Sequence, residues 1–193
     1  MFRLADTGGG VPLYQLKITL RGCRPSVWRR VVVRGDVTLA RLHRVIQTAM
    51  GWLGGPLYHF RVGRVCYGIP HPDLDKVEGE SLEEKPFTLT DLAPTAKKRF
   101  VYEYDFDCWE HTVVVEKVLS PNTNFKHPIC LGGANACPPE DCGVSQGYAE
   151  FVEAMADPKH KQHKQMQAWV GKAWDATLFS PEEANAALRR IRA

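Results

Sequence analysis

Three cysteines lie in one short segment of the chain, at a spacing that could bind a metal ion. Cys130, Cys137 and Cys142 are separated by six and four residues, and His111 and His127 precede them. Zinc in proteins takes four nitrogen or sulfur ligands arranged as a tetrahedron. The cysteines with His111 fit that number and predict a zinc cofactor, with His127 as the alternative fourth ligand. Because no Cys-x2-Cys pair occurs, three thiols in a loop rich in Pro and Gly is the other interpretation.

Carboxylates crowd the same region of the chain. Asp105, Asp107 and His111 lie close together in sequence, on either side of Trp109. Two carboxylates with a histidine could transfer protons or bind a divalent ion, which makes these three the candidate catalytic residues. A turn rich in Asp also caps backbone amides for purely structural reasons. No nucleophile with a neighbouring base can be named, so an enzyme is the less favoured interpretation.

A second acidic pair follows two prolines within the cysteine segment. Glu140 and Asp141 come directly after Pro138 and Pro139, and with Trp109 they are candidate binding residues. A loop lock or a helix cap is the alternative role for such a pair. Since ligand-type side chains are densest between residues 99 and 143, we predict that one functional site lies there.

Positive charge is concentrated in the first part of the chain. Residues 1–75 carry 11 Lys and Arg against 4 Asp and Glu, whereas residues 76–193 carry 14 against 18. Ten of the eleven cations are arginine, which suits planar recognition of phosphate or carboxylate. The sequence predicts a surface for nucleic acid or an anionic protein partner, and a solvated basic face is the alternative. The arginines that would form it are Arg29, Arg30, Arg34, Arg41 and Arg44.

The elements that must position these residues are strands first and helices later. Apolar and polar residues alternate over residues 11–20 and 27–34, which predicts two half-buried strands. The second strand places Arg29 on the face of its alternate valines. Residues 39–50 show the spacing of an amphipathic helix, after a cap at Thr38 and before a glycine at Gly51. A short hairpin over residues 58–67 and a long hairpin over residues 99–119 follow.

The remaining segments complete an α+β chain. We expect an irregular excursion over residues 68–82, a cysteine loop over residues 130–143, and helices over residues 148–155, 160–170 and 180–191. This order predicts a β-grasp-like mixed sheet with one packed helix, a long hairpin and a C-terminal helical segment. The predicted organisation is a disordered lead (1–11), one α+β domain (12–157) and a helical extension packed on it (158–193).

Composition is that of an ordinary globular chain. Of the 193 residues, 44% are hydrophobic and 24% are charged, enough to bury a core. No run of 18 apolar residues occurs, so no membrane-spanning helix is expected. The first ten residues have no apolar stretch typical of a signal peptide. We therefore expect a cytoplasmic protein whose cysteines are thiols or metal ligands.

Several stretches together resemble the plasmid pRiA4b ORF-3-like family, also labelled as TnpR-type passenger proteins of insertion elements. They occur in the family's order between residues 12 and 157: Tyr14-Gln-Leu-Lys-Ile-Thr-Leu20, Pro25-Ser-Val-Trp-Arg-Arg30, Leu39-Ala-Arg-Leu-His43 with Met50-Gly-Trp52, Tyr102-Glu-Tyr-Asp-Phe106 with Trp109-Glu-His111, and Cys137-Pro-Pro-Glu-Asp141. Two features depart from the family pattern. The glycine that usually follows Phe106 is missing, and His59 falls one place later than the family's histidine.

The resemblance implies an accessory or binding protein associated with mobile DNA, because the family has no established activity. Zinc at the hairpin and cysteine loop would stabilise such a protein. The alternative function is a metal-dependent or acid–base enzyme that uses Asp105, Asp107 and His111 on a small acidic or phosphate-bearing substrate.

Overall fold

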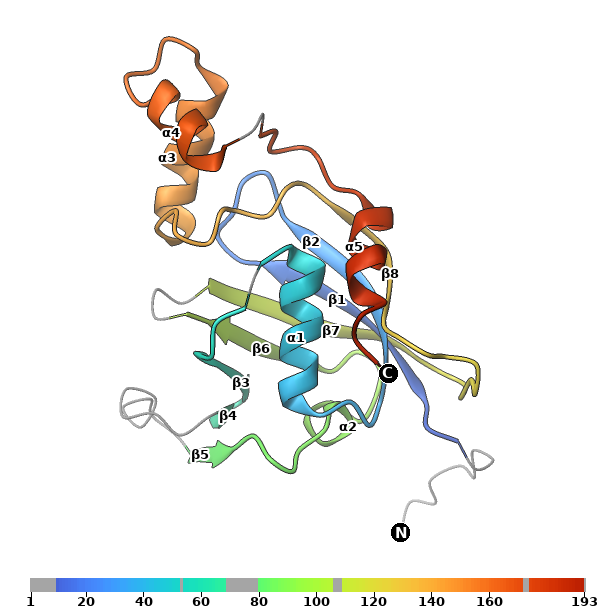
Figure 1. Cartoon of the computed structure of the whole chain (residues 1–193). Coiled ribbons are helices and arrows are strands. Elements are labelled where there is room, and N and C mark those ends of the chain that lie inside the picture. Colours follow the sequence, from blue (N-terminus) through green and yellow to red (C-terminus); the bar gives the residue numbers. More distant parts are fainter. Residues whose placement is uncertain (1–9, 53, 69–79, 106–108, 172–173, 193) are drawn as a thin grey trace.

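The computed structural model describes residues 10–52, 54–68, 80–105, 109–171 and 174–192. Within them a large sheet carries one long helix across its face, and further helices follow toward the C-terminus (Figure 1). Most of the predicted lead, residues 1–9, and the candidate Asp107 lie outside the described residues. In chain order the elements are β1 (Leu13–Leu20), β2 (Trp28–Arg34), α1 (Leu39–Met50), β3 (Tyr58–Val62), β4 (Val65–Gly68), β5 (Glu80–Glu83), α2 (Leu89–Leu92), β6 (Arg99–Tyr104), β7 (Trp109–Leu119), β8 (Ile129–Ala134), α3 (Val144–Ala156), α4 (His163–Val170) and α5 (Pro181–Leu188).

The strands form one mixed sheet in the order β5-β4-β3-β6-β7-β1-β2-β8. Each neighbouring pair is antiparallel except β4 and β5, which run parallel. The long hairpin β6–β7 lies at the centre, beside β1. Strands and helices are segregated along the chain and not alternated as βαβ units, so the predicted α+β class is confirmed.

Alternating side chains decide which face of the sheet is covered. Tyr14, Leu16 and Ile18 of β1 are buried, whereas the intervening Gln15 and Lys17 are partly exposed. A period of two residues places alternate side chains on opposite faces of a strand. The buried set packs under α1, and the other set lies on the opposite, open face.

Helix α1 covers the inner face because its ends are capped and one side is apolar. The Thr38 side chain accepts a hydrogen bond from the Arg41 backbone N–H, and Gly51 ends the helix with φ of 91°. A positive φ costs glycine little because it has no Cβ. Leu42 and Ile46 of α1 are fully buried in the core. Figure 1 shows α1 lying across the sheet with α5 beside it.

Two segments differ from the sequence-based expectation. Residues 129–134 form strand β8 along β2, so Cys130 lies in a strand, although a loop was predicted there. Residues 69–79 of the predicted irregular excursion lie outside the described residues, and residues 80–83, at its end, form β5 along β4. Both segments occupy sheet edges, where an unpaired strand offers N–H and C=O groups to any extended chain that reaches it. The alternation of apolar and polar residues within β5 or β8 does not reveal that the segment pairs with a neighbouring strand.

Helices α3 and α4 form a separate layer at one end of the sheet (Figure 1). Phe151 of α3 is buried and meets the ring of Trp169 edge-on, with centroids 5.7 Å apart. His163 Nδ1 donates to the Ala154 carbonyl oxygen at 2.9 Å, which ties the two helices together. No helix in the described part of the chain is long and apolar enough to cross a membrane.

Candidate functional site

Residues 137–142 are held by hydrogen bonds from three aromatic side chains, one after α1 and two in the sheet. Trp52 Nε1 donates to the Pro138 carbonyl oxygen at 2.8 Å, and Trp109 Nε1 donates to the Glu140 carbonyl oxygen at 3.4 Å. The hydroxyl of Tyr104 donates to Glu140 Oε1 at 2.8 Å. We call residues 137–142 the anchored loop. It lies between two hollows of different size.

The larger hollow is a groove of about 770 Å³ between α1, α5 and the anchored loop. Its lining is largely apolar and includes Met50, Pro138, Trp174, Leu178 and Phe179. Leu178 is 64% exposed, which is high for a large apolar side chain. Leu178 is exposed and Trp174 and Phe179 are half-buried, whereas Met50 and Pro138 are buried, so the concave surface presents three apolar side chains to solvent.

Acidic side chains stand at the edge of this groove. Glu140, Asp175 and Glu183 line it, and the latter two are exposed. Arg29 also lines the groove, but it is only 1% exposed and its guanidinium binds groups inside the protein. The groove therefore presents apolar surface with negative charge to solvent.

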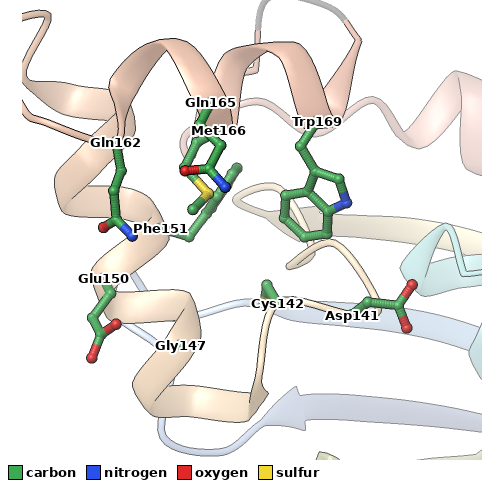
Figure 2. Close-up of a pocket in the computed structure, with 9 residues that line it drawn as sticks. All are labelled: Asp141, Cys142, Gly147, Glu150, Phe151, Gln162, Gln165, Met166 and Trp169. Atoms are coloured by element: carbon green, nitrogen blue, oxygen red, sulfur yellow. The ribbon is translucent and has the colours of Figure 1, made fainter.

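The smaller hollow is a pocket of about 350 Å³ between α3, α4 and the other side of the anchored loop (Figure 2). Asp141 and Cys142 line it from the anchored loop, Glu150 from α3 and Trp169 from α4. Asp141 and Cys142 face this pocket, whereas Cys137 to Glu140 line the groove. The acidic pair after the prolines is thus divided between two sites.

His111 is fully buried in β7 and is packed among aromatic rings. Its ring centroid lies 5.4 Å from Trp52 and 5.2 Å from Tyr102. Nδ1 donates to the backbone carbonyl oxygens of Trp109 at 3.0 Å and Tyr102 at 3.3 Å. Burial lowers the pKa of His111 to about 4, so the ring is neutral at pH 7.

The structure does not bring His111 and Cys130 together. Cys130 pairs with Val31, which pairs with Leu16, which in turn pairs with Val115. His111 lies three strands away from β8 and four residues farther along β7. These offsets are about 14 Å across and about 13 Å along the sheet. Since zinc ligands lie about 2.0–2.3 Å from the ion, the two cannot share it.

The three predicted cysteine ligands have different surroundings. Cys130 is buried in β8, and Cys137 and Cys142 lie at opposite ends of the anchored loop near Cys23. Burial raises the pKa of Cys142 to about 12 and that of Cys137 well above its usual range. These thiols are therefore protonated at pH 7. Among the described residues, no three or more His, Cys, Asp or Glu side chains are placed to hold a metal ion. Zinc binding stays a prediction.

The candidate carboxylates at the hairpin tip are only partly described. Asp105 has a φ of 65°, and its backbone N–H donates to the Leu57 carbonyl oxygen at 2.9 Å. Asp107 lies outside the described residues. Trp109, which we singled out for binding, is 2% exposed and supports the anchored loop from within. A catalytic role for Asp105, Asp107 and His111 stays a prediction.

The predicted arginine surface is divided by the fold. Arg29 is buried, as expected from its place among the valines of β2. Arg30 makes two hydrogen bonds to Glu116, at 2.6 and 2.8 Å, and Arg34 makes two to Asp36. Both lie on the open face of the sheet. Arg41 and Arg44 lie on the solvent side of α1, which covers the inner face, so these four arginines do not form one surface.

Arg29 itself holds three parts of the chain together. Nε donates to the Ala49 carbonyl oxygen at 3.0 Å, and Nη1 donates to those of Trp28 and Ala134 at 2.9 and 3.0 Å. Its guanidinium stacks on Phe179, 3.7 Å from the ring centroid. The residue thus connects α1, β2, β8 and the segment before α5.

A buried polar network next to His111 was missed by the sequence analysis. The Tyr102 hydroxyl accepts from Gln47 Nε2 at 2.7 Å and pairs with His43 Nδ1 at 2.7 Å. His43 also stacks on Tyr58 at 3.7 Å. Burial lowers the pKa of His43 to about 4. His43 borders the apolar stripe of α1 in sequence. His43, Trp52 and Tyr104 also lie in the stretches that resemble the family, but neither signal indicates which side chains they contact.

Known proteins resemble the chain over most of its length. The family described as plasmid pRiA4b ORF-3-like protein matches residues 12–183, which reaches beyond residue 157 into α5. The uncharacterized protein y4hQ of Sinorhizobium fredii (strain NBRC 101917 / NGR234) is 38% identical over 181 residues, 93% of this chain and 92% of that protein.

A solved structure has the same overall fold. The crystal structure of the protein of unknown function MM3350 from Methanosarcina mazei Go1 has a TM-score of 0.78 and 29% identity, and the similarity covers 91% of this chain and 98% of that one. Together with the family match over residues 12–183, this shows that the chain belongs to the plasmid pRiA4b ORF-3-like family.

Proposed function

We propose that this protein is a non-catalytic binding protein that holds an extended peptide segment of a partner in the groove beside the anchored loop. The observation that carries the proposal is the groove itself, about 770 Å³ with an apolar lining that includes Trp174, Leu178 and Phe179. Partner segments commonly bind by placing apolar side chains in such grooves.

The charge of the groove favours a basic peptide. Asp175 and Glu183 are exposed at its edge, and Arg29 is buried beneath Phe179. Opposite charge at the rim raises association rates and rejects acidic partners. The expected ligand is therefore a segment with two or three apolar side chains flanked by Lys or Arg.

The neighbouring side chains favour binding over catalysis. The thiol of Cys137 has a raised pKa and is protonated, so it is a poor nucleophile. His111 is fully buried behind Trp52 and does not itself line the groove. The family is named after a plasmid-encoded protein, and on that basis we propose that the partner belongs to a mobile DNA element.

The proposal can be tested with a random peptide library displayed on phage. We expect selection on the full chain to enrich apolar peptides with basic flanks. The Leu178→Asp variant should weaken binding of an enriched, fluorescently labelled peptide by at least about tenfold, because Leu178 is an exposed apolar contact in the groove.

Leu131→Asp is the matched control, because Leu131 is 52% exposed and does not line the groove. It should leave the affinity unchanged. Failure to enrich any peptide, or equal losses in both variants, would contradict the proposal. So would turnover of a hydrolase or transferase substrate that is lost on His111→Ala or Asp107→Ala, which would favour the enzyme alternative.

A further inference from the structure

The groove between α1, α5 and the anchored loop contains a buried cation. Arg29 lines this groove and is only 1% exposed. Burial lowers the pKa of its guanidinium, which is still charged at pH 7. Buried charges in proteins are usually paired, because a partner offsets the cost of removing the ion from water. Unlike Arg30 and Arg61, Arg29 forms no ion pair with a carboxylate of the described residues.

The internal contacts of Arg29 use two of its three guanidinium nitrogens. Nε donates to the Ala49 carbonyl oxygen, and Nη1 donates to those of Trp28 and Ala134. Nη2 has no hydrogen-bond partner among the described residues. Within that part of the chain, the fully buried side-chain atoms without a partner belong to other residues, so Nη2 keeps a small contact with solvent. Because Arg29 lines the groove, the two N–H groups of Nη2 are available to a molecule bound there.

The surroundings of the guanidinium favour the end of a chain as its partner. Phe179 covers one face, with its ring centroid 3.7 Å from Cζ, and backbone carbonyl oxygens occupy the edges at Nε and Nη1. Little room is left for a chain that continues on both sides of Nη2. A carboxylate makes strong hydrogen bonds with guanidinium N–H groups, and capture of a C-terminal carboxylate is a recurring mode of peptide recognition.

The charges at the edge of the groove favour the same orientation. Asp175 and Glu183 are exposed at this edge, whereas the cation is buried. A ligand with an anionic end and a cationic flank is complementary to this pattern. The exposed Leu178 supplies apolar surface for side chains that precede the carboxylate.

We propose that the groove binds the C-terminal end of a basic, apolar peptide and that Nη2 of Arg29 donates hydrogen bonds to its terminal carboxylate. The last side chains of the peptide lie against the apolar lining, and the Lys or Arg residues before them lie near Asp175 and Glu183. This inference rests on the peptide-binding function proposed for the groove, and it names the end of the partner that is bound.

The inference can be tested by isothermal titration of the full chain with synthetic peptides. The probes are N-acetylated pentapeptides, two lysines followed by three residues drawn from Leu, Phe and Met, each made with a free carboxylate and as the C-terminal amide. We expect the acid form to bind at least about tenfold more tightly, because the amide has no negative charge to pair with Arg29. The amide of a peptide that ends in Asp should bind as weakly as the other amides.

Arg29→Gln removes the positive charge and should reduce the preference for the acid form to less than about twofold. Arg30→Gln is the matched control, because Arg30 is next in sequence, pairs with Glu116 and does not line the groove. It should leave the preference unchanged. Circular dichroism checks that both variants are folded. If Arg29→Gln does not fold, the comparison of acid and amide on the unaltered chain still decides.

Each outcome separates this inference from the proposed function. Equal affinity of the acid and amide forms would overturn the inference and leave peptide binding in the groove standing. Failure of both forms to bind up to about 1 mM would overturn both. If the amide ending in Asp bound as tightly as the acid form, recognition of the C-terminus would be wrong. A preference that persists in Arg29→Gln, or is lost equally in Arg30→Gln, would contradict the role of Arg29.

Discussion

The imidazole of His111 donates from Nδ1 to two backbone carbonyl oxygens, so the neutral ring carries its proton on that nitrogen. Nε2 is then a bare acceptor, and it has no hydrogen-bond partner among the described residues. A metal-ligating histidine likewise donates a hydrogen bond from one ring nitrogen and leaves the other nitrogen free for the ion. His111 therefore resembles a metal ligand in the nitrogen that carries its proton and in the cysteines that follow it in sequence. Its place between Trp52 and Tyr102 instead makes it part of an aromatic core.

Burial of two histidines predicts a loss of stability in mild acid. The pKa values of His43 and His111 fall from 6.5 to about 4 in the folded chain. Below pH 6.5 the unfolded chain binds protons that the folded chain does not, so the free energy of unfolding falls as pH falls toward 4. Between pH 6.5 and pH 5 we expect a loss on the order of 1.5 kcal/mol per histidine, measured by urea denaturation.

The carboxylates with lowered pKa values titrate outside the range from pH 6.5 to pH 5. Burial alone would raise the pKa of Glu103, but hydrogen bonds from His59 and Arg61 outweigh burial and lower it to about 2. Its contribution is present above about pH 4.5 and is lost only as pH falls toward 2. His111→Gln should therefore remove about half of the change between pH 6.5 and pH 5. An unchanged pH dependence in this variant would contradict the assignment.

At the scale of elements, the anchored loop depends on donors supplied by other segments. Trp52 follows α1, Tyr104 ends β6 and Trp109 begins β7, and each donates to the loop. The Tyr104 hydroxyl also accepts from the Gly55 backbone N–H at 2.8 Å. Two of the acceptors are backbone carbonyl oxygens, so the position of the loop depends little on its own side chains. The Pro-Pro pair limits its backbone further.

Removing one of these donors should destabilise the protein. Trp52→Phe keeps an aromatic ring next to His111 and Trp109 but loses the hydrogen bond to the Pro138 carbonyl oxygen. A buried acceptor left without its donor costs about 1–3 kcal/mol. We expect the free energy of unfolding, measured by circular dichroism in urea, to fall by about that amount. Trp169→Phe, at an exposed tryptophan, should change it by less than about 0.5 kcal/mol. Equal effects would contradict the anchoring role.

At the scale of the whole molecule, the basic half of the sequence does not become one basic face. Arg30 and Arg34 lie on the open face of the sheet and are paired with Glu116 and Asp36. The open face also carries Lys17, whose ammonium lies 5.2 Å from the Trp28 ring centroid. Arg21, Arg30 and Arg61 pair with Glu110, Glu116 and Glu103 from later segments, so part of the charge asymmetry along the chain is cancelled in space.

This pairing predicts how DNA binding would respond to mutation. Nucleic-acid binding that depends on phosphate contacts weakens steeply with salt. Because Glu116 and Asp36 already offset two of the arginines, we expect Arg30→Ala with Arg34→Ala to change DNA affinity by less than about threefold, measured by fluorescence anisotropy across a salt series. A loss of more than about tenfold at low salt would show that these arginines form a phosphate-binding surface.

The sequence by itself determined the family and most of the local elements, β5 and β8 excepted. The period of two in residues 11–20 and 27–34 gave the strands and placed Arg29 on the buried face, and the caps around residues 39–50 gave α1. Each pattern depends on residues only a few positions apart in sequence, so it predicts a strand or a helix without knowledge of the tertiary structure.

Only the tertiary structure decided which distant residues meet. Strands β1 and β2 lie between His111 in β7 and Cys130 in β8, although both residues belong to one continuous segment of the chain. The pairing of β8 with β2, the partners of Arg30 and Arg34, and the pocket between α3 and α4 likewise depend on contacts between segments far apart in sequence. Long-range pairing follows from how the whole core packs, and no local spacing specifies it.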